Sequence, residues 1–226
     1  MLKHYFKTFF RRVMSISPVD FNLKINERVP LKIKEFLEKF PTAFIMGGFV
    51  TAALHDEEFS DIDLFFHKKN ATEVFNFFGK DCLGDNDKKY FQSRSFFFQD
   101  ITVHCRKITV DGFSIDLVMY GDGFNPSIHV DFSCRMLQFS HQGLRYPHYI
   151  CLQDVFNKNL RINLIWFFMN ELKTIGSICP PFWSICSPAQ MICNIRWYPQ
   201  EILPAWQQKL INNIEKYERR GYTLIS

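Results

Sequence analysis

Two aspartates separated by one apolar residue are the side chains of this sequence best suited to chemistry. The run Asp61-Ile62-Asp63-Leu64 alternates acidic and apolar residues, a pattern that predicts a β-strand. Residues two apart on a strand share a face, so both carboxylates point the same way. Adjacent carboxylates repel each other unless a cation lies between them, and such oxygen ligands suit Mg²⁺. An isolated Asp-x-Asp also occurs on solvated strand edges, so the pair alone leaves a structural interpretation open.

A glycine pair lies thirteen positions before the first of these acids. Gly47 and Gly48 follow a short β-prone run, Thr42–Met46, and precede Phe49–Leu54, which has the length and composition of one or two helical turns. Glycine lets the backbone approach a ligand closely, and N–H groups at a helix start favour phosphate. A phosphate cradle beside paired carboxylates predicts phosphoryl or nucleotidyl transfer. By itself, Gly-Gly is usually only a turn.

In this order, the glycine pair, the short helix and the acidic strand resemble the signature of the DNA polymerase β-like nucleotidyltransferase superfamily. The resemblance implies an α/β (α+β) fold, in which a small mixed β-sheet head with flanking helices precedes a mostly helical neck. It also implies two Mg²⁺ ions held by Asp61, Asp63 and a third carboxylate on a neighbouring strand. Asp116 is a lone acid in the apolar run Ser114–Val118, and burying it without a partner would be costly. The resemblance therefore assigns Asp116 as the third acid. The alternative places Asp116 at a solvent-facing sheet edge.

The segment Ile128–Phe139 looks like a degenerate copy of the Arg-Arg-Asp-Phe-Thr-apolar-Asn-Ala motif of class II tRNA nucleotidyltransferases and bacterial poly(A) polymerases. In that family the aspartate contacts the ribose of the incoming nucleotide, so the resemblance assigns Asp131 to nucleotide binding. A helix or strand cap is the alternative role for this residue. His129 and Val130 replace the arginine pair that contacts the triphosphate in the family, and Arg135 replaces the asparagine.

Two weaker matches follow. Asp154 and Arg161 have the spacing of the family's Asp-Leu-x-x-x-x-Leu-Arg neck motif, although such a pair also occurs in an ordinary helical turn or loop. Ile214–Tyr222 resembles the helix that closes the neck. The family's base-reading Glu-Asp-x-x-Arg falls on residues 205–209, where the acid pair is missing and Lys209 takes the arginine's place. The resemblance therefore adds Asp154, Arg161 and Lys209 to the nucleotide-binding residues without indicating which base is read.

Length and composition predict a globular chain with a substantial core. The 226 residues are 22% charged and 47% hydrophobic and include 26 phenylalanines. We expect three regions: N-terminal helices over 1–40, a nucleotidyltransferase head over 41–150 and a helical, neck-like region over 151–226. Within the first region, breaks at Ser17-Pro18 and Asn26 predict a helix over Glu27–Phe40.

Further elements are expected within the head. Asn70 is predicted to cap a helix. Strand-like runs cover Tyr90–Phe98, Ile101–Val110 and Phe113–Tyr120, and Asp111-Gly112 at the last junction predicts a tight hairpin.

Cysteine use and hydropathy indicate the compartment. Seven cysteines without a Cys-x-x-Cys pair favour buried free thiols in a reducing, intracellular and cytoplasmic environment over disulfides or a zinc site. No apolar run reaches transmembrane length, and the longest candidate is Leu164–Met169, so no membrane partner is expected. The basic segment 1–17 predicts a surface helix or, alternatively, an organelle-targeting peptide. The net charge of +4 permits nucleic acid as a partner without requiring it.

Together these features predict a Mg²⁺-dependent nucleotidyltransferase that moves a nucleoside monophosphate from a nucleoside triphosphate to an acceptor hydroxyl and releases pyrophosphate. The resemblance favours an RNA 3′ end as acceptor, with a protein or a small molecule as alternatives. A nucleotide-binding or scaffold protein without catalysis is the alternative from another class. Three acids retained together argue against it, because a site without function has no need to hold mutually repelling carboxylates. The oligomeric state stays open.

Overall fold

The computed structural model of the protein describes residues 18–79, 92–95, 98–102, 104–122, 130–163 and 205–225, without the side chains of 18–19, 92–105 and 206. The predicted N-terminal basic helix, the segment Leu164–Met169 and most of the turn-rich stretch after Gly79 lie outside these residues. None of the helices within the described ranges has the length and apolar character that crossing a membrane requires.

Residues 18–39, the first that the structure describes, form two helices, where a single one was expected over Glu27–Phe40. Helix α2 spans Pro18–Arg28 and helix α3 spans Leu31–Lys39, so the predicted break at Asn26 is wrong. Proline suits the first position of a helix, which explains the start at Pro18. Pro30 separates the two helices and serves as the N-cap of α3, because a proline lacks the N–H that would continue the preceding helix.

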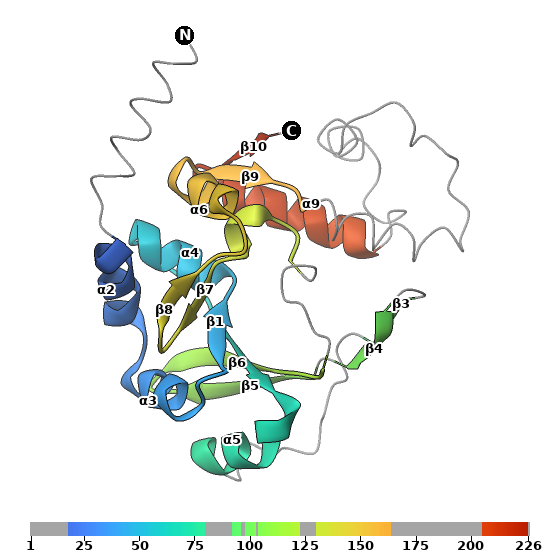
Figure 1. The fold of residues 1–226 in the computed structure, drawn as a ribbon. Coiled ribbons are helices and arrows are strands. Elements are labelled where there is room, and N and C mark those ends of the chain that lie inside the picture. Colours follow the sequence, from blue (N-terminus) through green and yellow to red (C-terminus); the bar gives the residue numbers. More distant parts are fainter. Residues whose placement is uncertain are drawn as a thin grey trace.

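A mixed six-stranded sheet forms the centre of the molecule, which confirms the expected α/β class (Figure 1). Its strand order is β5-β6-β2-β1-β7-β8, and β2 and β6 are parallel while the other neighbours are antiparallel. The bounds are β1 Phe44–Met46, β2 Ile62–His67, β5 His104–Val110, β6 Phe113–Tyr120, β7 Gln138–Ser140 and β8 Gly143–Arg145. Helix α4, Gly48–His55, connects β1 to β2 as expected from the sequence.

The predicted hairpin joins β5 to β6. Asp111 and Gly112 have φ angles of 51° and 82°, the positive values that a tight two-residue turn requires at both positions. The strand expected over Ile101–Val110 is instead two strands. Strand β4, Phe98–Thr102, pairs with β3, Gln92–Ser95, whereas β5 pairs with β6, so the two halves have different partners.

Helix α5, Ala71–Phe78, follows a 3₁₀ turn over Lys68–Asn70. Asn70 holds the predicted N-cap position, but its side chain makes no capping hydrogen bond.

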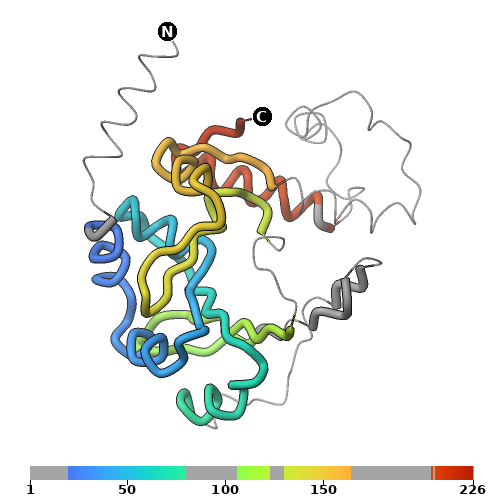
Figure 2. Tube along the Cα trace, in the orientation of Figure 1, coloured from blue at the N-terminus to red at the C-terminus, as the bar shows by residue number. Residues whose placement is uncertain are grey.

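The C-terminal elements gather at one end of the sheet, away from α3 and α5 (Figure 1). They are α6, Tyr149–Phe156; β9, Asn159–Arg161; α9, Ala205–Glu218; and β10, Thr223–Ile225. The parallel pair β9–β10 was not expected in a region predicted as helical, since strands of three residues are too short to show an alternating pattern. Figure 2 shows residues 130–163 passing from the sheet towards α9.

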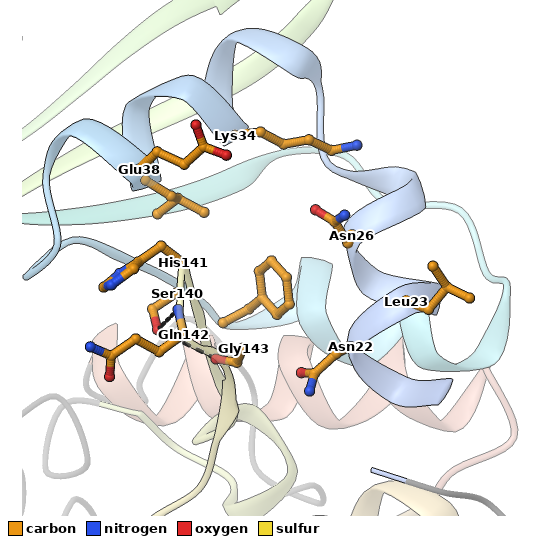
Figure 3. A pocket seen from close by; sticks show the side chains of 11 residues that line it. Asn22, Leu23, Asn26, Lys34, Glu38, Ser140, His141, Gln142 and Gly143 are labelled. Carbon is orange, nitrogen blue, oxygen red and sulfur yellow. Dashed lines mark hydrogen bonds between the residues drawn. The ribbon is translucent and has the colours of Figure 1, made fainter. Parts of the chain in front are cut away.

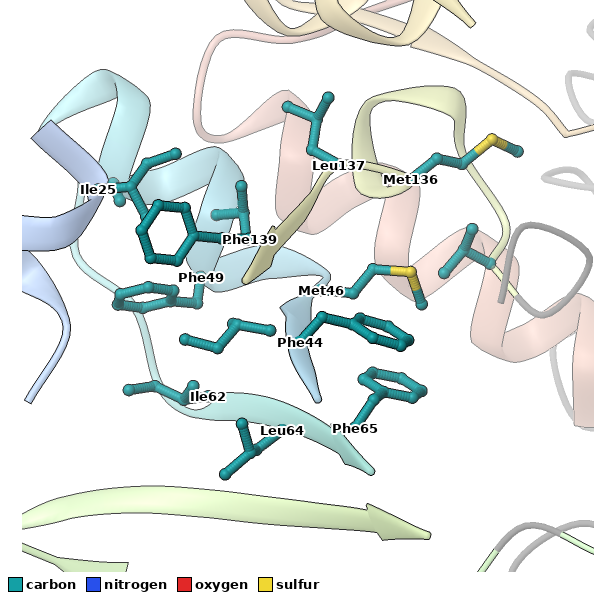
Figure 4. Close-up of a cluster of buried hydrophobic side chains, with 14 of the residues drawn as sticks. Ile25, Phe44, Met46, Phe49, Ile62, Leu64, Phe65, Met136, Leu137 and Phe139 are labelled. Atoms are coloured by element: carbon teal, nitrogen blue, oxygen red, sulfur yellow. The ribbon is translucent and has the colours of Figure 1, made fainter. Parts of the chain in front are cut away.

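Apolar side chains from the sheet and its helices form one continuous core. Ile62 and Leu64 of β2 are fully buried there, on the same side of the sheet as Phe139 of β7 (Figure 4). Phe44 and Met46 of β1, whose register partners are Phe65 and Asp63, are buried on the other side. Cys134 and Cys151 are buried free thiols, as predicted for the cysteines. The core therefore fixes the apolar face of β2, and the opposite face of that strand is left for the acids.

Phe36 of α3 tests how much the aromatic part of this core contributes to stability. The ring is fully buried and lies within 6.5 Å, centroid to centroid, of the rings of Phe40, Phe66, Phe77 and Phe78. We expect Phe36→Ala to lower the free energy of unfolding, measured with urea, by about 3–5 kcal/mol. Leu31→Ala in the same helix is the control, since Leu31 is 69% exposed and its truncation should cost under about 0.5 kcal/mol. Equal losses in the two variants would contradict this assignment of the core.

Candidate active site

The parallel pairing of β2 with β6 brings three predicted acids together. Asp63 and Asp116 are direct partners in the register, and Asp61 lies two residues before Asp63 on the same side of the chain. Ile62 and Leu64 point the other way into the core with no exposed surface, as the alternating pattern predicted. The geometry thus places the carboxylates of two sequence-distant segments on one face of the sheet.

The predicted glycine pair lies against these acids. Gly47 follows β1 as the N-cap of α4, with a φ of +97°. A Cβ atom there would lie 2.7 Å from Oδ2 of Asp63, closer than real contacts allow. Gly48 begins α4, and its Cβ would lie 3.7 Å from the hydroxyl of Tyr217 in α9. Residue 47 must therefore be glycine both for its backbone angle and for the approach of Asp63.

Helix α4 is held in place by hydrogen bonds near both ends. Near its start, the hydroxyl of Thr51 donates to the carbonyl oxygen of Cys134 at 3.1 Å. Near its end, the guanidinium of Arg28 donates to the carbonyl oxygens of Ala52 and Glu57 at 3.0 and 2.7 Å. These contacts fix the glycine turn relative to the acids, because the turn is continuous with the helix.

Two of the three acids, Asp63 and Asp116, have raised pKa values. Burial raises the pKa of Asp63 to about 6; the charge of Arg135 opposes this rise, and the carboxylates of Asp61 and Asp116 add to it. Burial also raises the pKa of Asp116, with Lys107 opposing. The ammonium of Lys107 lies 3.5 Å from Oδ1 of Asp116, an electrostatic contact that leaves this buried oxygen without a hydrogen bond among the described residues. The cluster is short of positive charge.

The acidic cluster is not a complete metal site in itself. Within the described ranges, the structure has no group of three or more His, Cys, Asp or Glu side chains that could hold a metal ion. Mg²⁺ does not need such a group, since it is commonly held by one or two carboxylates, water and substrate phosphates. Asp63 and the orphaned Oδ1 of Asp116 are side by side in the register, and Asp61, whose Oδ1 accepts a 2.9 Å hydrogen bond from Ser60, is the third donor.

Asp131 is buried and held by two side chains. Its Oδ1 accepts a hydrogen bond from Nη1 of Arg135 at 2.8 Å, and its Oδ2 accepts one from Nδ2 of Asn213 at 2.6 Å. The main-chain N–H of Asn163 donates to the carbonyl oxygen of Asp131 at 2.8 Å. The predicted sugar-contacting residue therefore joins the sheet region to α9.

Asp154 and Arg161 are partners of one another. Asp154, at 1% exposure in α6, accepts hydrogen bonds from Ser133, from Asn159 at 3.4 Å and from Nε of Arg161 at 3.1 Å. Arg161 ends β9. The spacing of the neck motif thus corresponds to an ion pair that supports the 3₁₀ turn Ser133–Arg135, which begins two residues after Asp131.

Helix α9 presents cations towards the acids. The charge of Lys209, the one predicted residue on this helix, lowers the pKa of Asp63, although burial of Asp63 outweighs it. Lys216 was missed: partial burial and then the charge of Arg220 lower its pKa, while Asp61 and Asp63 act to raise it. Positions 209, 213 and 216 share one helix face, so helical spacing could have identified Lys216 and Asn213.

Arg135 and Lys107 were missed for a different reason. Arg135 stands where the resembled motif has asparagine, and Lys107 lies opposite Asp116 on the neighbouring strand β5. The pairing of Lys107 with Asp116 follows from the register of the predicted two-residue hairpin, whereas the approach of Arg135 to Gly47 appears only in the tertiary structure.

A pocket of about 470 Å³ lies elsewhere, between α2, α3 and the turn that joins β7 to β8 (Figure 3). Asn22, Lys34, Glu38 and His141 are among the residues that line it. It shares no residue with the acidic site and includes none of the predicted site residues.

No family model matches the chain, and no curated protein matches it. Solved structures do show similarity. The Thermotoga maritima CCA-adding enzyme complexed with tRNA is 18% identical with a TM-score of 0.45, and the match covers 87% of this chain and 45% of that one. A CCA-adding enzyme complexed with ATP is 18% identical with a TM-score of 0.43, and the match covers 87% of this chain and 46% of that one. A tRNA nucleotidyltransferase complexed with a primer tRNA and an incoming ATP analogue is 14% identical with a TM-score of 0.39, and the match covers 84% of this chain and 50% of that one. The chain spans about half the length of these proteins, which belong to the enzyme class that the sequence resembles.

Gly47 offers a test of the close approach between the glycine turn and Asp63. We expect Gly47→Ala to displace the Asp63 carboxylate and to lower the thermal midpoint further than Gly112→Ala. Both glycines have positive φ, but a Cβ at Gly112 meets no atom within 4 Å, so this matched control isolates the clash from the backbone strain of about 1 kcal/mol. Equal midpoints for the two variants, measured by differential scanning calorimetry, would refute the close approach.

The raised pKa of Asp63 predicts a pH-dependent stability in metal-free protein. The folded pKa of about 6 lies above the ordinary value of 3.8, so the folded state binds the proton more tightly and this group loses stability as pH rises from about 4 to about 6. Asp63→Asn cannot ionise and avoids that loss. We expect this variant to exceed the original protein in free energy of unfolding by up to about 3 kcal/mol at pH 7.5 and by little at pH 4.

Asp111→Asn, in the exposed hairpin turn, is the control for this titration. The free energy of unfolding of Asp111→Asn, relative to the original protein, should not rise between pH 4 and pH 7.5 as it does for Asp63→Asn. Urea unfolding with a chelator present measures both variants. A constant difference for Asp63→Asn across this range would contradict the raised pKa.

Proposed function

We propose that the protein is a Mg²⁺-dependent nucleotidyltransferase that transfers a nucleoside monophosphate from a nucleoside triphosphate to an acceptor hydroxyl, with release of pyrophosphate. The observation that carries this proposal is the register of Asp63 against Asp116, with Asp61 beside them and the Gly47 turn in close approach. A cluster of repelling, partly buried acids next to a glycine turn is the arrangement that this chemistry needs.

The three acids are assigned to two Mg²⁺ ions. When bound, the ions would lower the pKa of the acceptor hydroxyl and neutralise the charge that develops on the pyrophosphate. Asp61 and Asp63 hold the shared ligand positions. Asp116 completes the set and orients the acceptor hydroxyl, since its buried Oδ1 has acceptor capacity that no described hydrogen-bond donor uses.

The nucleotide is assigned to the space between the glycine turn and α9. The backbone at Gly47 and Gly48 receives the phosphates, because the absence of side chains lets a ligand reach the main-chain N–H groups at the start of α4. Lys209 and Asp131 contribute from the α9 side, with Asp131 at the sugar, as the resemblance implies. Asp154 and Arg161 support this nucleotide site indirectly. Their ion pair holds Ser133, and so the turn that also carries Arg135, through the hydrogen bond from Ser133 to Asp154.

An RNA 3′ end is the acceptor that we favour, on the strength of the sequence resemblance. Protein and small-molecule hydroxyls are the alternatives, and the assay below distinguishes them. The free thiols of Cys134 and Cys151 fit a reducing, intracellular compartment.

The test is transfer of label from each α-³²P nucleoside triphosphate, with Mg²⁺, to total RNA, to a protein lysate and to a small-molecule extract in separate reactions. We expect label in one acceptor class. Asp63→Asn should lower the rate by about 10²–10³-fold or more, the scale of removing one group that stabilises developing charge. Asp111→Asn, which retains the fold and lies in the exposed hairpin turn, should transfer at the original rate.

Two results would overturn the proposal. One is the absence of label in every acceptor class with every nucleotide. The other is transfer that persists in the double variant Asp61→Asn/Asp63→Asn, since no described group could then replace both carboxylates. Nucleotide binding that is retained without transfer would instead indicate a binding or scaffold protein.

A further inference from the structure

Arg135 is a largely buried cation beside the candidate active site and has no role in the proposed chemistry so far. Its side chain is 22% exposed, and within the described part of the chain it makes one hydrogen bond, from Nη1 to Asp131. Its Nε is buried without a hydrogen-bond partner among the same residues. A guanidinium carries a fork of five N–H donors, so most of the donor capacity of Arg135 has no acceptor among the described residues.

The free side of Arg135 faces the glycine turn. Its Nη2 lies 3.9 Å from the position that a Cβ would occupy at Gly47, and that same position is 2.7 Å from Oδ2 of Asp63. The guanidinium is therefore next to the point where the turn meets the acids. An anionic group bound at the turn would meet Arg135 directly.

Lys216 approaches the same place from α9. Two neighbours on this helix contact the site: Asn213 holds Asp131, and the hydroxyl of Tyr217 would lie 3.7 Å from a Cβ at Gly48. Lys216 is exposed and lies three residues after Asn213 in this helix, so it shares the face that meets the site, and its charge interacts with those of Asp61 and Asp63. Cations from two separate elements thus converge on one turn.

A polyphosphate is the ligand whose chemistry suits this combination. A guanidinium fork pairs with phosphate oxygens in two parallel hydrogen bonds, and an ammonium adds a mobile point charge. Single phosphates occur both in the tail of a nucleotide and in the backbone of a nucleic acid. The tail is favoured here, because a terminal chain can enter a site where the guanidinium is only 22% exposed, whereas a continuous backbone cannot.

We propose that Arg135 and Lys216 bind the polyphosphate tail of the nucleotide at the glycine turn. They take over the charge that the arginine pair supplies in the resembled motif, where this chain has His129 and Val130. The inference rests on the proposed function and deepens it by assigning residues to the phosphates.

The experiment measures binding of inorganic triphosphate by isothermal titration calorimetry, without divalent metal, so that it does not depend on transfer. We expect Arg135→Met and Lys216→Met each to raise the dissociation constant about tenfold or more, and Arg135→Lys to fall between Arg135→Met and the original protein. The controls are Arg145→Met on β8 and Lys34→Met at the pocket of Figure 3, which should bind as the original protein does.

Folding is controlled separately. Arg135→Met leaves Asp131 buried without its cation, so the double variant Arg135→Met/Asp131→Asn, which removes both charges, is measured beside it. Lys216→Met changes an exposed position and should keep the original thermal midpoint. The binding loss must appear both in Lys216→Met and in the double variant, and its absence from either one overturns the proposal.

A single-stranded RNA oligonucleotide distinguishes the two phosphate sources. Weakened oligonucleotide binding with unchanged triphosphate binding in the two Met variants would overturn the proposal and assign these cations to the acceptor. No triphosphate binding by the original protein would also overturn it. Triphosphate binding that depends on Arg135, in a protein that transfers no label, would leave this inference standing while the proposed function fails.

Discussion

The repulsion among Asp61, Asp63 and Asp116 is the constraint on which the rest of the site depends. Parallel pairing of β2 with β6 forces two of these carboxylates side by side, and burial raises the pKa of Asp63 to about 6. Two cations partly offset the repulsion. The ammonium of Lys107 lies 3.5 Å from the carboxylate of Asp116, and the charge of Arg135 lowers the pKa of Asp63. Neither removes the deficit of positive charge. A cation bound at such a cluster would offset the repulsion, because an opposite charge nearby stabilises the ionised form of each carboxylate.

A second set of contacts links the sheet to the C-terminal elements through buried polar groups. The carboxylate of Asp131 accepts hydrogen bonds from Arg135 and Asn213. The carboxylate of Asp154 accepts hydrogen bonds from Ser133 and Arg161, so each of the two buried groups has several donors. Buried polar groups that are satisfied in this way hold one geometry, because any other arrangement would leave a charge unpaired. The 3₁₀ turn Ser133–Arg135 lies between the two carboxylates and carries residues that contact both. Through this turn, α9 is positioned over the start of α4, where the proposed phosphate-binding cations meet the glycine turn.

This arrangement separates the stabilising parts of the molecule from the reactive ones. The apolar face of β2 is fully buried and belongs to the core, whereas its acidic face carries the candidate chemistry. Alternation along one strand therefore gives each residue type a different environment within a few ångströms. Gly47 matters both for the fold and for the candidate site. Its missing side chain permits the positive φ of the turn and also the close approach of Asp63.

The sequence by itself determined the local part of this protein. Alternation predicted β2 and the shared face of Asp61 and Asp63, the glycine pair predicted the turn into α4, and Asp111-Gly112 predicted the hairpin, because each depends on neighbours in the chain. The motif resemblance further pointed to Asp116 as the third acid and to an α/β fold. The tertiary structure alone decided which segments meet: the pairing of β9 with β10, the hydrogen bond from Asn213 to Asp131 and the approach of Arg135 to Gly47. It also corrected the helix expected over Glu27–Phe40, which Pro30 divides. Contacts between residues far apart in the chain depend on register and packing, which no local pattern records.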